Sequence, residues 1–211
     1  MVSPRLASGF RIGRAAADFF EVMPELTPVL AAASELVSFC RARAWSNCLI
    51  GGLAVQRWGE PRFTRDADLT LLTGFGPESE FVEQLIRWFT PRRPDAAEFA
   101  LRARVVLLKA ANGVDLDVAL GALPFEERSV QRSSDYAFKE GCVLPTCSAE
   151  DLIVHKVFAG RERDWADVVG VLSRQGENLD LSLVRNELRP LLEAKEDSES
   201  MAKFERLASG F

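Results

Sequence analysis

The chain has 211 residues, enough for one compact domain or for a domain with a helical extension. Its apolar share of 47% and charged share of 27% argue against a disordered chain, and its net charge of −5 gives no basic footprint for a nucleic acid. No apolar run of about 18 residues marks a membrane span, and no secretory signal opens the chain. The four cysteines match no zinc or disulfide pattern, so we expect idle thiols in a cytoplasmic protein.

The first part of the chain mixes helical and strand-like segments. Apolar residues at helical spacing predict a helix over residues 24–43, and a shorter helix is expected over 53–58. Residues 66–72 alternate in polarity and are rich in Leu and Thr, which favours a strand. A further helix is expected to begin at Pro77.

A dipeptide in the middle of the chain predicts a β-hairpin. Asn112-Gly113 stands between two β-like runs, residues 102–109 and 114–120. Asn-Gly between apolar runs favours a type I′ turn, which needs positive φ at both central residues. We therefore expect two antiparallel strands here, and a last short strand over residues 142–144.

The last part of the chain is typical of helices. Ser148 can cap a helix N-terminus, and the acidic pair Glu150-Asp151 suits the first turn. Helical patterns cover residues 150–159, 164–173 and 181–192 and a charged tail to residue 207.

These elements predict an α/β (α+β) fold with a short, mixed, largely antiparallel sheet flanked by helices. We expect an α/β core with an N-terminal helix over residues 1–145 and a helical part over residues 146–211. A site between the two parts would draw residues from both.

Two pairs of acids carry the strongest chemical signal. Asp66 and Asp68 lie two residues apart on an expected strand, so both carboxylates face the same way. Their mutual repulsion is removed by a divalent cation, and oxygen ligands suit Mg²⁺ or Mn²⁺. Asp115 and Asp117 share one face of the hairpin strand, where a solvated face is the ordinary alternative. If the strands are neighbours, one of these acids completes a site for two metal ions.

A glycine pair precedes the short helix. Gly51 and Gly52 lack side chains, so backbone N–H groups there can approach a phosphate closely, and the helix N-terminus favours negative charge. A tight turn is the ordinary meaning of such a pair. The glycine pair indicates a phosphate site only in combination with Asp66 and Asp68, which follow it.

Together these segments resemble the nucleotidyltransferase superfamily with the polymerase-β-like fold. Its pattern is an apolar residue before Gly-Gly or Gly-Ser, then a spacer and Asp-x-Asp, and later a lone acid on a neighbouring strand. The pairs Gly51-Gly52 and Asp66-Ala67-Asp68 and the single Asp117 fill those places. Within the superfamily the chain is most similar to the AbiEii-like group of toxin–antitoxin and abortive-infection systems. The likeness is carried by residues 51–56, 61–68, 150–156 and 161–167.

The resemblance implies a metal-dependent transfer of a nucleoside monophosphate from a nucleoside triphosphate to an acceptor hydroxyl, with release of pyrophosphate. Asp66 and Asp68 would hold two Mg²⁺ or Mn²⁺ ions, and Asp117 would hold the second ion. Gly51 and Gly52 would hold the triphosphate.

Four more residues receive a role by the same resemblance, and a fifth lies beside them. Lys156 would face the nucleotide, although a lysine beside an apolar helix stripe usually reaches water. Arg62 would contact phosphate and Thr64 would position the acidic strand, unless both lie in an exposed loop. Asp164 would support the site by orienting Lys156, and Asp115 is a neighbour without an assigned role.

Two residues are expected to be structural. His155, the single histidine, has no Cys or His partner at metal spacing and favours a packing role. The ordinary expectation for Asp167 is a surface ion pair with Arg163, one helical turn away.

The acceptor stays open between a protein hydroxyl, the 3′ end of an RNA and a small molecule, and a partner protein fits the family setting. A non-catalytic nucleotide-binding or antitoxin-like module is the first rival class, although all three acids are present. A metal-dependent glycosyltransferase is less favoured, because only 65 mostly helical residues precede Asp66.

Overall fold

A computed structural model describes residues 26–211. No helix in that range is long and apolar enough to span a membrane. Its elements are, in chain order, α2 (Pro28–Arg41), β1 (Asn47–Leu49), α3 (Gly51–Trp58), β2 (Asp66–Leu72), α4 (Glu78–Trp88), β3 (Thr90–Pro91), α5 (Ala96–Ala103), β4 (Val105–Lys109), β5 (Asp115–Gly121), α6 (Pro124–Gln131), β6 (Ser134–Lys139), β7 (Cys142–Thr146), α7 (Ala149–Ala159), α8 (Glu162–Gln175), a 3₁₀ turn (Gly176–Asn178), α9 (Leu181–Ala194) and α10 (Ser198–Ala208).

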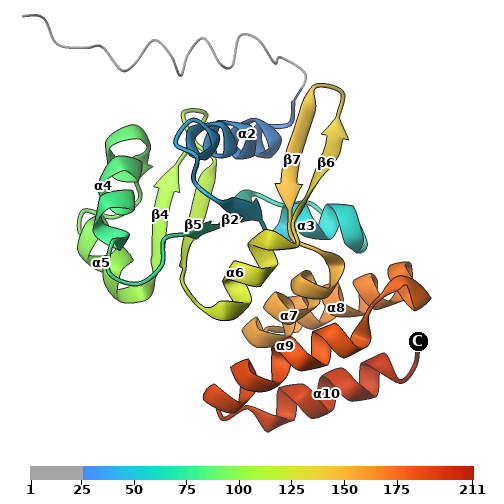
Figure 1. Ribbon diagram of the computed structural model, residues 1–211. Helices are drawn as coiled ribbons and strands as arrows, with labels where there is room; N and C mark the ends of the chain where they lie inside the picture. Colours follow the sequence, from blue (N-terminus) through green and yellow to red (C-terminus); the bar gives the residue numbers. More distant parts are fainter. Residues whose placement is uncertain (1–25) are drawn as a thin grey trace, which may run out of the picture.

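The strands of the described residues form one sheet of seven in the order β3-β4-β5-β2-β1-β7-β6. The pairs β3–β4, β4–β5, β1–β2 and β6–β7 are antiparallel, whereas β2–β5 and β1–β7 are parallel. The predicted mixed and largely antiparallel sheet flanked by helices is confirmed (Figure 1).

The parallel pairing of β2 with β5 aligns the two acid pairs. Asp66 lies opposite Asp115, and Asp68 lies opposite Asp117. Between the acids of β2, the side chain of Ala67 is fully buried, because successive residues of a strand face opposite sides of the sheet. All four acids therefore lie on one face of the sheet, and the expectation that the two strands are neighbours is confirmed.

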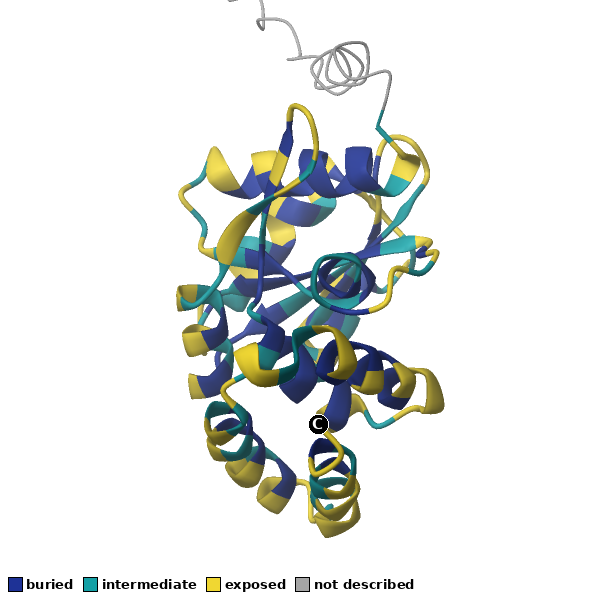
Figure 2. Ribbon diagram, turned by 90° about the vertical axis from the view of Figure 1, so that its right-hand side faces the viewer, coloured by how far each residue is buried: buried dark blue, intermediate teal, exposed yellow. Residues whose placement is uncertain are grey.

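Helices cover the two faces of the sheet with separate apolar cores. Helices α2, α4 and α5 pack on the face away from the acids, around Leu36, Leu69 and Leu116. The second core joins α3 and α6 to α7, α8, α9 and α10, around Val55 and Ile153. Buried residues run through the strands and along the inner sides of the helices (Figure 2). The acids thus face the layer that contains the C-terminal helices.

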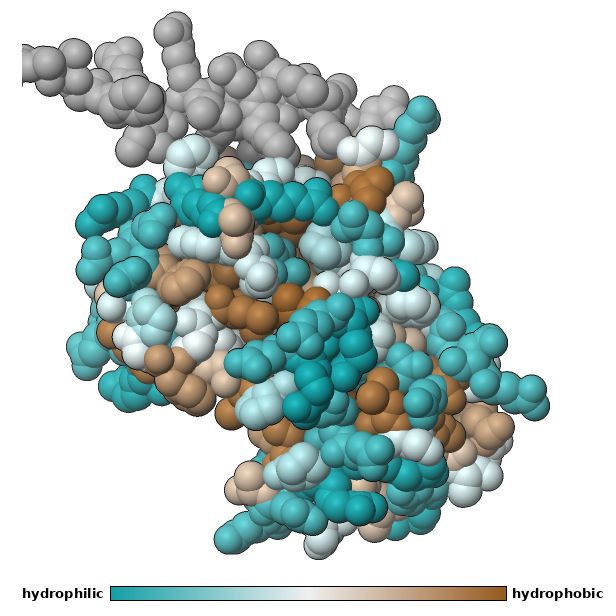
Figure 3. Space-filling view, viewed as in Figure 1, coloured by the Kyte–Doolittle hydropathy of each residue, from teal (hydrophilic) through white to brown (hydrophobic). Residues whose placement is uncertain are grey.

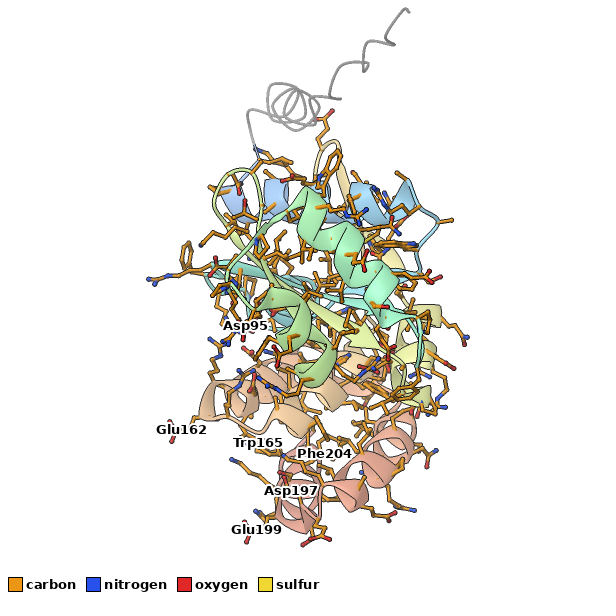
Figure 4. The ribbon with its side chains drawn as sticks, turned by 90° about the vertical axis from the view of Figure 1, so that its left-hand side faces the viewer. Asp95, Glu162, Trp165, Asp197, Glu199 and Phe204 are labelled. Carbon is orange, nitrogen blue, oxygen red and sulfur yellow. The ribbon has the colours of Figure 1, made fainter. Side chains whose placement is uncertain are left out.

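The C-terminal helices share their core with the sheet part of the chain. Phe204 of α10 is fully buried, and Figure 4 shows it beside Trp165 inside the helical part, with Glu162 and Glu199 at the edge. β7 extends to Thr146, and the same core includes Cys48 of β1. The division into residues 1–145 and 146–211 stays a prediction.

The hairpin is present, but its turn differs from the predicted type I′. Gly113 has φ of 83°, whereas Asn112 does not have positive φ. The Ala110 N–H donates to the Val114 carbonyl, and the Gly113 N–H donates to the Ala110 carbonyl, which leaves a three-residue loop. The Asn112 amide instead donates to the carbonyl of Pro28, 2.7 Å away. The expected positive φ at both turn residues is therefore wrong.

The sequence does not predict helices α5 and α6 or strands β3 and β6. Residues 102 and 103 end helix α5 instead of opening a strand, because Arg104 adopts left-handed φ of 53° and separates the helix from β4. Helix α6 was missed, although Pro124 and Glu126 form an ordinary helix start. Strand β6 is not predicted either, although Tyr136 and Phe138 are two residues apart, the spacing of neighbours on one face of a strand, and their rings are in contact.

Candidate active site

One cavity brings together nearly all of the predicted site residues. It has a volume of about 350 Å³ and lies between the acid face of the sheet and helices α3, α7 and α8. Nine of the ten predicted residues line it, and Asp115 does not. The nine are Gly51, Gly52, Arg62, Thr64, Asp66, Asp68, Asp117, Lys156 and Asp164.

The acids on the sheet are held close to one another at this cavity. Burial, followed by repulsion from Asp66 and Asp117, raises the pKa of Asp68 from 3.8 to about 6. Burial also raises the pKa of Asp117 above its ordinary value, although the charge of Arg92 acts against this. A hydrogen bond of 2.9 Å from Thr64 Oγ1 to Asp66 Oδ1 fixes the first acid. This wall of the cavity therefore has an excess of negative charge.

The glycine pair makes room for this wall. A Cβ atom on Gly51 would lie 1.9 Å from Asp68 Oδ2, and one on Gly52 would lie 2.3 Å from Thr64 Oγ1. Gly51 also has φ of 60°, which residues with a side chain rarely adopt. Helix α3 begins at Gly51, two residues earlier than predicted, and no side chain caps it. Gly51 is required by packing against Asp68 and Gly52 by packing against Thr64, whatever ligand their N–H groups meet.

Lys156 is buried rather than extended to water. Its ammonium lies 3.1 Å from Asp164 Oδ1 and 2.8 Å from Asp167 Oδ2, and its side chain is 7% exposed. The alternative of a lysine that reaches solvent is therefore wrong, because two carboxylates on α8 hold the ammonium. The expected contact between Asp164 and Lys156 is present.

Arginines complete this second wall of the cavity. Arg62 forms a bidentate ion pair with Asp167, with distances of 2.8 and 2.9 Å. Arg161 donates from Nε to Asp164 Oδ2 at 2.6 Å, and its side chain is 63% exposed. Asp167 is 6% exposed and pairs with Arg62 and Lys156 rather than with Arg163, so the expected surface pair is wrong.

Two side chains at the site were not expected there. Arg92 donates from Nη1 to Asp115 Oδ2 at 2.9 Å, and its Nη2 contacts Asp117 Oδ1. His155 lines the cavity and stacks edge to face on Phe125 at 5.0 Å, and its Nε2 has no hydrogen-bond partner. Burial lowers the pKa of His155 to about 4, so the ring is neutral at pH 7. No local spacing in the sequence indicates either residue, because their partners are far away along the chain.

The donors suit a divalent cation, although their side chains do not form a ready-made ligand group. Three carboxylates on adjacent strands are oxygen ligands of the kind that Mg²⁺ and Mn²⁺ prefer. Within residues 26–211, however, no group of three His, Cys, Asp or Glu side chains is arranged for metal binding. A protein donor instead engages each acid: Thr64 binds Asp66, the Gly52 N–H binds Asp68 and Arg92 binds Asp117.

The described residues also form two other cavities. A cavity of about 340 Å³ shares Arg62 with the site and has walls of Phe63, Tyr136 and Phe138. A larger cavity of about 550 Å³ lies between α9 and α10 and contains none of the predicted residues. On the face of the molecule seen in Figure 3, hydrophilic residues predominate and apolar side chains form scattered groups.

The chain is a nucleotidyltransferase by family, and its fold agrees with this class. The family described as "Nucleotidyl transferase AbiEii toxin, Type IV TA system" matches residues 46–208, and the chain belongs to this family. The predicted family and the prediction of a nucleotidyltransferase enzyme are thereby confirmed. No curated protein sequence matches the chain.

Solved structures of nucleotidyltransferases are similar to this chain at low sequence identity. The antibiotic-resistance factor ANT(2″)-Ia in solution is 15% identical, with a TM-score of 0.51 over 79% of this chain and 94% of that chain. An antigenic nucleotidyltransferase-like protein from Paracoccidioides brasiliensis is 15% identical, with a TM-score of 0.45 over 82% and 91%. The lincomycin-bound lincosamide antibiotic adenylyltransferase LnuA is 14% identical, with a TM-score of 0.43 over 66% and 93%. The first of these likenesses supports the nucleotidyltransferase fold.

Proposed function

We propose that the protein transfers a nucleoside monophosphate from a nucleoside triphosphate to an acceptor hydroxyl in a reaction that requires Mg²⁺ or Mn²⁺. The observation that carries this proposal is one cavity with Asp66, Asp68 and Asp117 on one wall and Lys156 and Arg161 on the other. Membership in a nucleotidyltransferase family supports it. The acids suit cations and the acceptor, and the cationic wall suits the triphosphate.

In this proposal each acid has a defined role. Asp66 and Asp68 would hold two divalent ions and Asp117 would hold the second. When bound, the ions supply charge stabilisation for the entering and leaving oxygens. The acceptor oxygen forms a bond to the α-phosphorus, and the bond from that phosphorus to the bridging oxygen breaks as pyrophosphate leaves. Asp117 would accept the hydroxyl proton.

The cationic wall would bind the leaving pyrophosphate. A lysine ammonium has three donors, and Asp164 and Asp167 occupy two of those on Lys156, so one is left for a phosphate oxygen. The exposed guanidinium of Arg161 has further free donors. Gly51 would bring the N-terminus of α3 to the same phosphates, because helix N-termini attract anions.

The biological setting and the acceptor belong to the proposal as well. The family supports a role in a cytoplasmic bacterial toxin–antitoxin or phage-defence system, with a partner protein. The acceptor is a protein hydroxyl, the 3′ end of an RNA or a small molecule. A non-catalytic nucleotide-binding or antitoxin-like module with this fold predicts nucleotide binding without turnover, so turnover separates it from the enzyme. Membership in the family argues against a glycosyltransferase.

The test is a measurement of binding and of turnover in the same protein. Each nucleoside triphosphate should raise the melting temperature in the presence of Mg²⁺, and α-phosphate label should enter an RNA, protein or small-molecule fraction. We expect Asp66→Asn and Asp68→Asn to lower the transfer rate by about 10³-fold, because several kcal/mol of charge stabilisation are lost. Asp135→Asn, on the exposed strand β6, is the control and should leave transfer unchanged. Full transfer in both site variants, or transfer without a divalent ion, would contradict the proposal.

A further inference from the structure

The guanidinium group of Arg92 contacts Asp117, the acid that is proposed to hold the second ion and to accept the proton. Arg92 follows the two-residue strand β3, and its backbone N–H donates to the Leu107 carbonyl of β4 at 3.0 Å. Its side chain extends from there to the acid face of the sheet, where it bridges Asp115 and Asp117. The side chain is 22% exposed, so the contact is partly shielded from water.

The two acids depend on Arg92 to different extents. Asp115 has a second cation, because Lys109 Nζ lies 2.5 Å from its Oδ1, and hydrogen bonds from Lys109 and Arg92 lower its pKa. Asp117 has no other cation within ion-pair distance among the described residues. Arg92 is thus the counter-ion of Asp117 and a second partner of Asp115.

The contact between Arg92 and Asp117 opposes the binding of a metal ion at this acid. A carboxylate oxygen that accepts from a guanidinium offers fewer lone pairs to a cation, and the positive charge of Arg92 opposes a second positive charge nearby. Arg92 Nε is buried without a hydrogen-bond partner, so the group is not fully satisfied in this position. The guanidinium is therefore retained by the acids more than by its own surroundings.

We propose that Arg92 is a positioning residue that holds Asp117 while the site is free of metal and competes with the divalent ion for this acid. The inference rests on the proposed function in one respect, namely that Asp117 is a metal ligand. Asp115 then has a role: it keeps the guanidinium when Asp117 is released, so that Arg92 stays folded against the sheet. Arg92 also keeps the four neighbouring carboxylates from repelling one another before metal binds.

The test is the affinity for Mn²⁺ alone, measured by calorimetry and by the electron paramagnetic resonance signal of free Mn²⁺. We expect Arg92→Met to bind Mn²⁺ about tenfold more tightly than the unchanged protein. The matched control is Arg93→Met, which removes the same charge from the next residue. Arg93 pairs with Asp95 instead of the site acids, so its variant should stay within about twofold. In metal-free buffer Arg92→Met should melt at a lower temperature, and Mn²⁺ should restore more stability to it than to the control.

Three results would overturn the inference. These are Mn²⁺ affinity in Arg92→Met that is unchanged or weaker, an equal gain in Arg93→Met, and no Mn²⁺ binding by any of the proteins. If Arg92→Met does not fold, Arg92→Lys replaces it, because lysine keeps the charge but cannot bridge two carboxylates in the same way. Its Mn²⁺ affinity should still rise, and an unchanged value would contradict the proposal.

A further variant separates this inference from the proposed function. Adding Asp117→Asn to Arg92→Met should remove the gain in Mn²⁺ affinity, because the contested oxygen is then no longer a carboxylate. None of these measurements uses turnover. A protein that binds Mn²⁺ as expected but transfers no nucleotide refutes the proposed function alone. A protein that transfers nucleotide with Mn²⁺ affinity unaffected by Arg92→Met refutes only the role of Arg92.

Discussion

The two walls of the cavity use charge in opposite ways. On the sheet, four carboxylates face two cations, whereas on the helical side three cations face two carboxylates. The acids of the sheet wall are Asp66, Asp68 and Asp117, and Asp115, Arg92 and Lys109 adjoin them outside the lining of the cavity. The helical wall consists of Asp164 and Asp167 with Arg62, Lys156 and Arg161. The carboxylates of the helical wall are all paired and one cation is in excess, whereas the acids on the sheet outnumber their cations by two.

The acids of the two walls differ accordingly in pKa. Burial raises the pKa of Asp68 and Asp117, and on Asp68 the neighbouring acids raise it further. Burial also acts to raise the pKa of Asp164 and Asp167, but hydrogen bonds from Lys156 and the arginines outweigh it, so both pKa values are lowered. Burial alone therefore does not identify a reactive acid. The number of cations that contact a buried carboxylate decides whether its pKa is raised or lowered.

The largest effect should follow from breaking the helical wall. Lys156→Met leaves two buried carboxylates with one cation each, and we expect the free energy of unfolding to fall by about 3 kcal/mol, the lower end for a broken buried ion pair. Urea denaturation measures the loss. The control Lys203→Met removes an exposed lysine that lies over the Trp165 ring and should change stability by less than about 1 kcal/mol. Equal stabilities of the two variants would show that the helical wall does not depend on its lysine.

The sheet wall should respond in the opposite direction when a charge is removed. The pKa of Asp68 is raised from 3.8 to about 6 on folding, so in metal-free buffer stability is lost as pH rises from about 4 to 6. The full shift corresponds to about 3 kcal/mol, which partial exposure reduces to about 2. Asp68→Asn should therefore be more stable than the unchanged protein at pH 7.5 and equally stable near pH 4. Denaturation curves at both pH values check this, and a less stable variant at pH 7.5 would refute it.

The smallest change in stability is expected at Asp115, which adjoins the sheet wall. Lys109 and Arg92 both pair with it and its side chain is 37% exposed, so Asp115→Asn should lower stability by less than about 1 kcal/mol. We expect its transfer rate to fall less than tenfold, whereas Asp117→Asn should lose about 10³-fold. Steady-state rates of the two variants decide between the acids. The reverse order would mean that Asp115 is the third acid of the site.

Local patterns made the sheet wall predictable from the sequence. β2 has the predicted bounds, and in its first half the partly exposed Asp66 and Asp68 alternate with the buried Ala67 and Leu69. Asp66 and Asp68 are neighbours on one strand, so their shared face follows from the strand period. The hairpin is predictable because Asn112-Gly113 is a local turn signal. Its turn type is not predictable, because the Asn112 side chain donates to the distant carbonyl of Pro28.

The ion pairs of both walls are less predictable from the sequence than the strands, because they join distant segments. Arg62 and Asp167 are 105 residues apart, and Arg92 and Asp117 are 25 residues apart. No sequence periodicity relates such pairs. The sequence therefore predicts Asp167 at the surface and indicates no role for Arg92. Lys156 was selected only through its family likeness, since the sequence does not reveal that two buried carboxylates hold it.

The pairing of β1 with β7 restricts the order in which the protein can form during synthesis. β1 lies between β2 and β7, and Leu49 pairs with Thr146, so one edge of β1 has no partner until most of the chain has left the ribosome. Val55 of α3 likewise stays uncovered until helices α7 to α10 are made. A stop codon shortly before residue 142 would therefore leave a strand edge and an apolar surface exposed. Such a product is a template for aggregation rather than a smaller enzyme.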